Sequence, residues 1–481
     1  MATTAPLDPT ATPPATPAPP PRLTGRQRWV LTLLLGAQFM IAVDFSILNV
    51  ALPVVGRGLG FPLADLQWVA TAFALAAAGF TLLFGRVADL FGRRRVFLAG
   101  MAVLGVASLV GGLAVDPAML LVARVAQGLA TAAVTPAGMA LLTTSFPEGP
   151  LRDRALGLNG ALMSAGFTAG AVLGGLLTDL LSWRWAFFLN VPVAAVVLFA
   201  APALVAESRP ADRPRLDAPG AVTVTGGLLA LVYGFTSAGE RGWGAPLTVG
   251  ALVVSAALLA AFHAVERRAA APLVPVRILR RRGVVWGNVA GLLAFASETS
   301  LVFLMTLYLQ RVLGFSPLAT GLAFGVLGAG TVLGGVLGAR VIGRIGTRST
   351  LVTGALVQAV ATASLVLLGE GRGWLTLLLV ATFVGGVGNM LAIVGFMVTA
   401  TSGLPDAEQG LATGLATMTQ QVGITVGIPV MSAVATAHTS GAAGPAAVLH
   451  GVSLAVLLNA ALAAAVAVTS ALFLHGRRRT A

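Results

Sequence analysis

Short loops that carry most of the charge divide this chain of 481 residues into long apolar stretches. Each stretch is about 20 residues long, the length that an α-helix needs to cross ~30 Å of hydrocarbon. Hydrophobic residues make up 57% of the chain and charged residues 10%, against roughly 25% charged in soluble domains. Lipid-exposed backbone must satisfy its own hydrogen bonds, and the alternation of a membrane β-strand is missing. We therefore predict an all-α polytopic membrane protein.

The apolar stretches predict fourteen transmembrane helices. Six lie in the first half, two follow, and six more complete the chain. Their expected positions are 29–52, 67–88, 96–115, 118–142, 155–180, 187–206, 220–238, 246–264, 284–309, 318–342, 349–368, 374–402, 410–437 and 449–474.

Every basic residue is an arginine, and the arginines are concentrated in alternate loops. The positive-inside rule places such loops, and with an even number of helices both termini, in the cytoplasm. The net charge of +13 therefore indicates membrane topology and argues against nucleic-acid binding. The richness in Ala and Gly, with no lysine, is typical of a GC-rich bacterial genome, so we expect a multi-pass protein of the bacterial inner membrane.

The chain also contains an internal repeat at a separation of 254 residues. Asp44-Phe45-Ser46 matches Glu298-Thr299-Ser300, and Gly60-Phe61 matches Gly314-Phe315. A repeat of this size in a membrane protein indicates two related halves around a shared cavity. We expect a disordered tail at 1–25, a six-helix bundle at 26–206, a linker with two extra helices at 207–283, a second six-helix bundle at 284–475 and a basic tail at 476–481.

Several motifs resemble the major facilitator superfamily, in particular its fourteen-helix drug/proton antiporters. Gly85 to Arg95 (GRVADLFGRRR) is similar to the signature loop of that superfamily. Asp44 to Pro53 (DFSILNVALP), Arg124 to Gly128 (RVAQG) and Trp183 to Pro192 resemble motifs of the antiporter branch. The resemblance implies proton-driven export of hydrophobic, often cationic compounds across a lipid bilayer, by a protein that we expect to be monomeric.

Three charged residues are expected at a similar depth within the membrane: Asp44, Arg124 and Glu298. Charge at that depth is costly, so each of them needs a reason to be there. Loss of water favours the protonated form of a carboxyl group, whereas a nearby arginine favours the ionised form. We predict that Asp44 exchanges protons and that Arg124 sets its affinity. The alternative is a static buried ion pair.

Glu298 lies in a polar stretch, Ser297 to Ser300. It is predicted to be a second proton site or an anchor for a cationic substrate. The alternative is a glutamate that its hydroxyl neighbours satisfy by hydrogen bonds. In the helix that carries Arg124, the residues Gln127 and Thr131 continue one polar stripe that should face the bundle.

The signature loop is predicted to act as a conformational switch through Gly85, Asp89, Gly92, Arg93 and Arg94, with Asp89 as the switching partner. An acid at this edge can interact with a helix N-terminus or pair with an arginine in one conformation only. The simpler alternative is that the arginines only anchor the topology. The second copy of the loop has Gly343 in place of Asp89.

Glycines at intervals of four residues predict close helix contacts, either static or rocking, at Gly166, Gly170, Gly174, Gly423 and Gly427. The remaining polar and aromatic residues inside the predicted helices are candidates for a permissive, apolar substrate cavity. These candidates are Asn49, Trp68, Gln127, Phe295, Tyr308, Asn389, Gln420 and Gln421.

No catalytic site, metal site or cofactor is expected. The chain has no cysteine, and its four histidines are scattered without metal-ligand spacing. A phosphate-binding lysine loop cannot exist without lysine, which argues against ATP-driven transport. The alternatives that remain are an exporter dedicated to one endogenous metabolite or antibiotic, and a structural or sensory membrane protein.

Overall fold

The fold is seen in a computed structural model that describes residues 23–62, 65–146, 150–208, 217–269, 281–401, 406–437 and 444–474. Every regular element within these residues is a helix, which confirms the predicted all-α fold. Parts of the predicted tails and linker lie outside the described residues, namely 1–22, 209–216, 270–280 and 475–481.

The helices form a first set, an inserted pair and a second set. The first set is α1 (Gly25–Leu59), α2 (Gln67–Phe91), α3 (Arg93–Gly112), α4 (Pro117–Ser145), α5 (Pro150–Leu180), α6 (Trp185–Phe188) and α7 (Asn190–Leu204). The inserted pair is α8 (Ala218–Arg241) and α9 (Pro246–Glu266). The second set is α10 (Arg282–Leu307), η2 (Tyr308–Val312), α11 (Pro317–Ile345), α12 (Thr347–Ser364), η3 (Leu365–Leu367), η4 (Arg372–Trp374), α13 (Leu375–Thr401), α14 (Asp406–Ala437) and α15 (Pro445–Phe473).

Within the described ranges, 12 helices are long and apolar enough to cross a membrane. The number rises to 13 if the two bent segments of α2, Gln67–Thr81 and Leu83–Phe91, form one span. The apolar part of α5, Ala165–Leu180, is shorter than these. Many membrane spans are thus confirmed, whereas the count of fourteen and the cytoplasmic position of the termini stay predictions.

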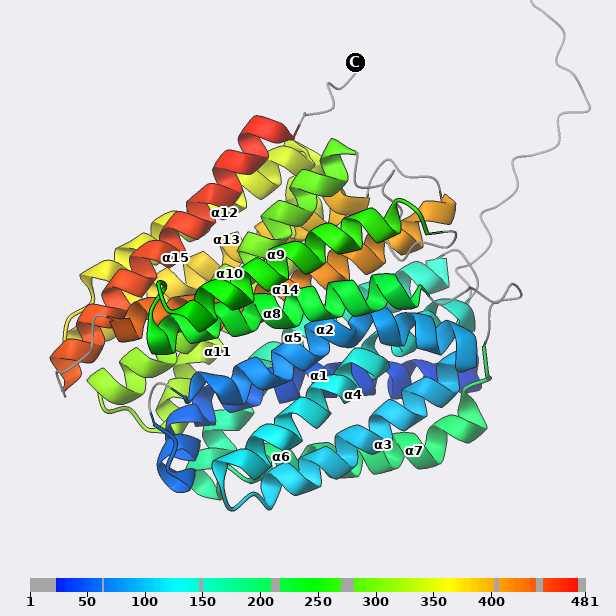
Figure 1. The fold of residues 1–481 in the computed structure, drawn as a ribbon, viewed down its shortest axis with the longest axis horizontal. Coiled ribbons are helices and arrows are strands. Elements are labelled where there is room, and N and C mark those ends of the chain that lie inside the picture. The colour runs from blue at the N-terminus through cyan, green and yellow to red at the C-terminus, as the bar shows by residue number, and fades with distance from the viewer. Residues whose placement is uncertain are drawn as a thin grey trace, which may run out of the picture.

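The two sets of helices pack in the same pattern. In the first set, α1 packs against α5 and α7, α2 against α4, and α3 against α4 and α7. In the second set, α10 packs against α14 and α15, α11 against α13, and α12 against α13 and α15. The two bundles meet where α5 contacts α11 and where α2 contacts α14. Figure 1 shows the first bundle in blue to sea-green and most of the second in yellow to red, with the brighter green α8 and α9 across the front.

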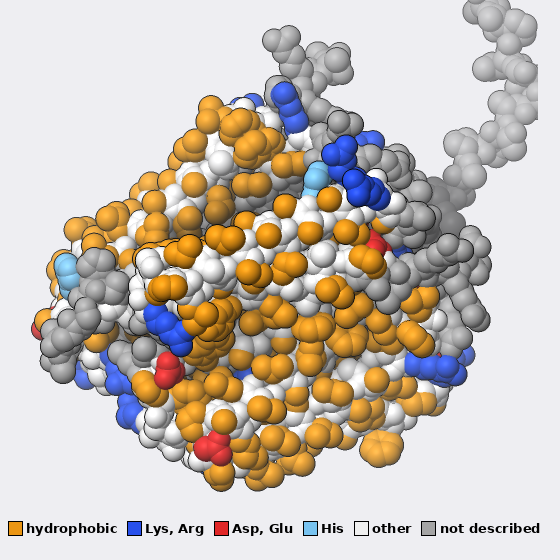
Figure 2. Space-filling model, in the orientation of Figure 1, with side chains coloured by type: hydrophobic (Ala, Val, Ile, Leu, Met, Phe, Trp, Pro, Cys, Tyr) orange, Lys and Arg blue, Asp and Glu red, His pale blue; other side chains and the backbone are white. Residues whose placement is uncertain are grey.

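The inserted pair covers the contact between α2 and α14. Helix α8 packs against both α2 and α14, and α9 packs on α8. The Thr225 hydroxyl of α8 donates to the carbonyl oxygen of Gly79 in α2 at 2.6 Å. The outer helix α9 exposes most of its apolar side chains, as a helix that faces lipid would. In Figure 2 this face is largely apolar, with charged side chains near its ends.

The internal repeat is visible in the backbone. Four of the glycines with left-handed φ angles form two pairs that are 254 residues apart. Gly60 and Gly314 have φ angles of 74° and 68°, and Gly92 and Gly346 have φ angles of 110° and 83°. A glycine tolerates this region because it lacks a Cβ. The same backbone turns therefore occur at equivalent places in both halves.

Helix packing reveals that the repeat slips by one residue inside α1 and α10. A Cβ at Gly166 would lie 2.8 Å from the Phe39 carbonyl oxygen, and one at Gly423 would lie 2.5 Å from that of Leu292. Phe39 and Leu292 are 253 residues apart, not 254. By this packing register, the position equivalent to Asp44 is Ser297, and Glu298 is equivalent to Phe45. The predicted equivalence of Asp44 and Glu298 is wrong by one residue.

A π-helical turn accounts for the extra residue. Element η2 is a π-helix, and the amide of Leu313 donates to the Tyr308 carbonyl oxygen five residues earlier, at 3.1 Å. A π-turn accommodates one more residue than the α-helix it interrupts. It therefore restores the separation of 254 residues before Gly314 is reached.

A shared apolar core joins the bundles at the end away from the signature loop. It combines the C-terminal half of α1, from Met40 to Val55, with residues 301–313 of α10 and η2. Two further large clusters, nearer the signature loop, belong almost entirely to one bundle each. The Gln310 side-chain amide also donates to the carbonyl oxygen of Val50 at 2.8 Å. The bundles are therefore closed against each other at the end opposite the signature loop.

The glycine contacts lead to a test of helix packing. A Cβ at Gly174 would overlap the Ile47 carbonyl oxygen, whereas one at Gly250 in α9 would have no atom within 4 Å. Alanine favours a helix by about 0.8–1.0 kcal/mol over glycine. We expect Gly174→Ala to lower the thermal unfolding midpoint of the purified protein and Gly250→Ala to leave it unchanged or raise it. Equal shifts for the two variants would contradict this packing.

Candidate functional site

The carboxylate of Asp44 is at the centre of a buried polar cluster in the first bundle. It accepts hydrogen bonds from Arg124 Nη1 at 3.4 Å, from Gln127 Nε2 at 3.1 Å and from the side-chain amide of Asn190. The side chains of Arg124 and Asp44 are 1% and 2% exposed. Arg124 and Gln127 reach the same carboxylate because residues three apart lie on one face of α4. The predicted pairing of Asp44 with Arg124 is present.

Arg124 has further partners that hold its guanidinium group in place. Its Nε donates to the Val69 carbonyl oxygen at 2.9 Å, and its Nη1 also donates to Gln127 Oε1 at 2.9 Å. The guanidinium carbon lies 4.2 Å from the centre of the Phe73 ring. A buried ion pair repays its desolvation only with good geometry and additional hydrogen bonds. Here α2 and α4 supply those hydrogen bonds.

Sequence reasoning did not assign two members of this cluster. Asn190, the first residue of α7, donates to both Asp44 and Ser108 Oγ, the latter at 3.1 Å. Ser108 of α3 also accepts from Gln127 Nε2 at 2.9 Å. Asn190 belonged to a motif that suggested the family, so its position was a usable signal. Ser108 had none, since one serine in an apolar helix is unremarkable.

The second bundle has an equivalent cluster without charge. Ser297 Oγ donates to Asn459 Oδ1 at 2.7 Å, and Gln358 Nε2 donates to Ser297 Oγ at 3.0 Å. Asn459 Nδ2 donates to Ser300 Oγ at 2.9 Å. These side chains come from α10, α12 and α15, the counterparts of α1, α3 and α7. The position that holds Asp44 in the first bundle thus holds Ser297 in the second.

Glu298 lies elsewhere, at the contact between the bundles. Its half-buried side chain lines a small cavity together with residues of α5 and α11. Within the described part of the chain it accepts no side-chain hydrogen bond and forms no ion pair. The cavity has room for about one water molecule. Its other lining residues are Phe167, Thr168, Ala171, Val302, Phe324, Leu327, Gly328 and Thr331.

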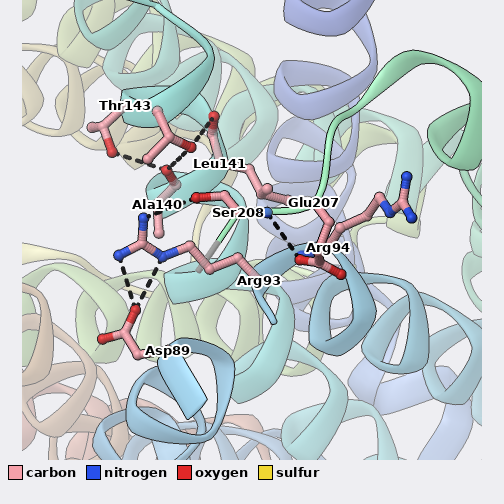
Figure 3. Close-up of polar contacts among 9 residues, drawn as sticks. Asp89, Arg93, Arg94, Ala140, Leu141, Thr143, Glu207 and Ser208 are labelled. Atoms are coloured by element: carbon pink, nitrogen blue, oxygen red, sulfur yellow. Dashed lines mark hydrogen bonds and ion pairs between the residues drawn. The ribbon is translucent and has the colours of Figure 1, made fainter. Parts of the chain in front are cut away.

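The signature loop is tied to the end of α7. Asp89 and Arg93 form an ion pair at 2.9 Å, and Arg93 Nη1 donates to Ser208 Oγ at 3.3 Å. The backbone amide of Arg94 donates to the Glu207 carboxylate at 3.0 Å, so Glu207 caps the N-terminus of α3 (Figure 3). An anion at a helix N-terminus is favourable because the amides there lack partners within the helix. Sequence reasoning did not single out Glu207.

One of the two glycines predicted to matter in this loop makes room for a neighbour. A Cβ at Gly92 would lie 2.8 Å from the Glu207 carboxyl carbon, whereas one at Gly85 would make an ordinary contact with Pro136 of α4, at 3.6 Å. In the second copy of the loop, Arg348 instead donates to the carbonyl oxygen of Ala471 in α15. The two copies of the loop are thus held by different contacts, and the switching role predicted for the first copy stays a prediction.

The residues predicted for a substrate cavity are dispersed. Tyr308 is fully buried, and its hydroxyl donates to the Gly369 carbonyl oxygen at 2.8 Å. Phe295 packs edge-on against Phe396, and Trp68 lies beside Tyr233 of α8. None of the predicted substrate residues lines the Glu298 cavity, so their role stays a prediction. The remaining ones are Asn49, Gln127 and Asn389, which are buried, and Gln420 and Gln421, which are half-buried.

Two pseudo-symmetric helical bundles, with an ion pair buried in the first and an acid at the contact between them, define the architecture of a membrane transporter. Residues 34–428 match the Major Facilitator Superfamily model. The chain belongs to this superfamily. It is therefore a multi-pass transporter of the bacterial inner membrane and not an enzyme.

Relatives at the sequence level carry names that refer to antibiotics. The chain is 41% identical to the puromycin resistance protein pur8 of Streptomyces alboniger, over 86% of this chain and 83% of that protein. It is 41% identical to the cephamycin export protein CmcT of Amycolatopsis lactamdurans, over 85% of each. It is 35% identical to the lincomycin resistance protein of Streptomyces lincolnensis, over 84% of each.

Solved structures share the fold at low sequence identity. The human organic anion transporter MFSD10 aligns with a TM-score of 0.61 at 17% identity, over 93% of this chain and 100% of that one. The nucleoside transporter NupG aligns with a TM-score of 0.63 at 13% identity, with the same coverage. At these identities the likeness supports the arrangement of the helices alone.

The buried ion pair predicts a non-additive effect on stability. Removal of one partner leaves an uncompensated buried charge, which costs about 3–5 kcal/mol. We expect Arg124→Gln to destabilise the protein strongly, and Asp44→Asn combined with Arg124→Gln to recover part of the loss. Unfolding of the purified variants in a double-mutant cycle measures the coupling. Strictly additive losses would show that the pair contributes nothing as a pair.

Gly92 and Gly346 offer a matched comparison for the signature loop. Both have left-handed φ angles, so alanine strains the backbone at either position. A Cβ at Gly92 also meets the Glu207 carboxylate, whereas one at Gly346 meets nothing within 4 Å. Gly92→Ala should therefore lower both transport and the unfolding midpoint more than Gly346→Ala. Equal effects in the two variants would argue against a role for Glu207.

Proposed function

We propose that this transporter is a proton-coupled antiporter that exports hydrophobic, often cationic drugs or antibiotics by alternating access. The observation that carries the proposal is the fully buried Asp44–Arg124 pair. A charged pair is costly to keep inside a membrane protein, and acids there often serve as proton relays. A carboxylate that changes partner between two conformations can exchange a proton with either side of the membrane.

The hydrogen bonds around Asp44 support the proposal that this residue changes partner. Three side-chain donors meet its carboxylate, and Gln127 and Asn190 also share Ser108 as a second acceptor. When Asp44 is protonated, these amides retain Ser108 as a partner. Arg124 likewise retains Val69 and Gln127. The rest of the cluster can therefore stay hydrogen-bonded while Asp44 is neutral.

The arrangement of the bundles supports alternating access. They share a continuous apolar core at the end opposite the signature loop, and the large clusters nearer the loop are mostly separate. Related halves that rock about a central site are the usual basis of such transport. The state seen here corresponds to closure at the end away from the signature loop.

The substrate class is supported by chemistry and by relatives. The surfaces where the bundles meet are apolar, which suits hydrophobic compounds. Proteins 35–41% identical to this one are named for puromycin, cephamycin and lincomycin. Because each of those names refers to one compound, an exporter dedicated to a single antibiotic or metabolite is the second candidate.

Proton coupling predicts that Asp44→Asn abolishes uptake of ethidium into inverted membrane vesicles energised by a proton gradient. The amide keeps the shape of the side chain but cannot exchange a proton. Asp116→Asn is the matched control, because Asp116 is an exposed N-cap of α4 and asparagine caps a helix equally well. Gradient-driven uptake retained in Asp44→Asn would refute the coupling role.

A substrate panel separates the two candidate functions. Drug-sensitive cells that carry the wild type or Asp44→Asn are compared for growth on ethidium, puromycin, lincomycin and cephamycin. A multidrug exporter protects against several unrelated compounds, and a dedicated exporter protects against one at most. Protection that Asp44→Asn retains in full would contradict the role of Asp44 in proton coupling.

A further inference from the structure

We propose that Glu298 is a second proton-binding site, separate from Asp44, and that its protonation holds α5 and α11 together where the two bundles meet. The inference rests on the proposed proton coupling, which it extends to a second acid. It is carried by the position of Glu298 in the fold, by the absence of a counter-charge around it and by the close approach of the two helices beside it.

The one-residue slip in the repeat places the two acids on different faces. Asp44 points into its own bundle, where Ser297 takes the equivalent place in the second bundle. Glu298 takes the place of Phe45, whose ring lies 6.2 Å from that of Phe167 in α5. Phe167 also lines the Glu298 cavity. Both residues at this position therefore face the contact between the bundles.

The described residues around Glu298 offer no positive charge. The described side chains that line its cavity are apolar except for Thr168 and Thr331. The hydroxyl of Thr331 already donates to the Gly328 carbonyl oxygen at 2.8 Å. Among the described parts of the helices around it, the charged or titratable side chains lie in other clusters or near helix ends: Arg26, Arg28, Asp44 and Arg57 in α1, Asp179 in α5, Arg282 in α10, Tyr308 and Arg311 in η2, Arg340 and Arg344 in α11, and His450 in α15.

This environment favours an uncharged carboxyl group. An ionised carboxylate without a counter-charge is costly in an apolar setting, and a protonated one is far less so. Asp44 differs, because three donors, one of them an arginine, meet its carboxylate. Asp44 thus has a counter-charge and hydrogen-bond donors around its carboxyl group, whereas Glu298 has no such side-chain partner among the described residues.

The cavity closes where α5 and α11 are closest. A Cβ at Gly321 would lie 2.8 Å from the Ala171 carbonyl oxygen, and one at Gly328 would overlap Thr168. If α5 and α11 separate, water reaches Glu298 and hydrates its carboxylate. The free-energy cost of the ionised form then falls. By linkage, proton binding favours the closed contact and proton release favours the open one. Lower pH therefore shifts the population towards closure.

The size of the cavity argues against a substrate in this state. Room for about one water molecule cannot hold a drug-sized compound, whose pockets measure about 300–1,000 Å³. Glu298 in the closed state can bind a proton and cannot anchor a substrate. This separates the two roles that the sequence leaves open for it.

The test measures the distance between α5 and α11 directly. The chain has no cysteine, so Leu180→Cys and Leu322→Cys can carry two spin labels without further changes. Both side chains are exposed and lie in the halves of α5 and α11 that are away from the signature loop, where the two helices approach each other most closely. Distances are measured by pulsed electron resonance in lipid nanodiscs from about pH 5 to about pH 9, a range wide enough for a buried carboxyl to titrate.

We expect the short-distance population to fall as the pH rises in the labelled protein, and to persist at every pH in Glu298→Gln. Glu370→Gln, which changes an exposed loop acid, should respond to pH as the parent does. A distance distribution that ignores pH in the parent, or one that responds equally in Glu298→Gln, overturns the proposal.

A second measurement covers the case in which Glu298→Gln does not fold. Glu298→Asp retains a carboxyl group and should retain the response to pH. The infrared band of a protonated carboxyl, present in the parent at neutral pH, should be missing from Glu298→Gln membranes and present in Asp44→Asn. Its persistence in Glu298→Gln contradicts the assignment. Neither readout needs transport, so both can fail while vesicle uptake still shows proton coupling, and the reverse also holds.

Discussion

A charge inside a membrane protein is stable only when other groups replace the water it has lost. The Asp44–Arg124 pair meets this condition through hydrogen bonds to Gln127, Asn190 and the backbone of Val69. These partners come from α2, α4 and α7, and Ser108 of α3 supports two of them. The arrangement of the first bundle around α1 is thus also the arrangement that satisfies one buried carboxylate.

The second bundle has an uncharged polar cluster at the place equivalent to the Asp44 cluster. Asn459 meets Ser297 where Asn190 meets Asp44, and Gln358 reaches Ser297 from α12, the counterpart of the helix that carries Ser108. The acid of the second half is one residue further along, at the contact between the bundles. The π-turn at Tyr308–Val312 absorbs the extra residue, so that the turn at Gly314 still matches the turn at Gly60. Pseudo-symmetry thus holds for the helices and their turns, while the two acids occupy different surroundings.

Much of the fold followed from hydropathy and from the repeat. Helices, an inserted pair and two related sets were all expected, because apolar length and periodicity are properties of the sequence itself. The pairing of Asp44 with Arg124 was also expected from their similar depth. The roles of Asn190, Ser108 and Glu207 were not, because one asparagine, one serine or one glutamate has no pattern of its own. Each acquires its part through contacts between helices, with residues 19 to 146 positions away in the sequence, which pattern reasoning cannot pair.

The sequence by itself determined which segments are helices, which residues lie deep within them and that the chain has two related halves. The tertiary structure alone decided which way the acids face. The reason is helical geometry: with 3.6 residues per turn, a slip of one residue rotates a side chain by about 100° around the helix axis. That rotation takes Glu298 from the interior of its own bundle to the contact with the other. An alignment of the two halves by residue type did not reveal it, whereas the packing of the glycines did.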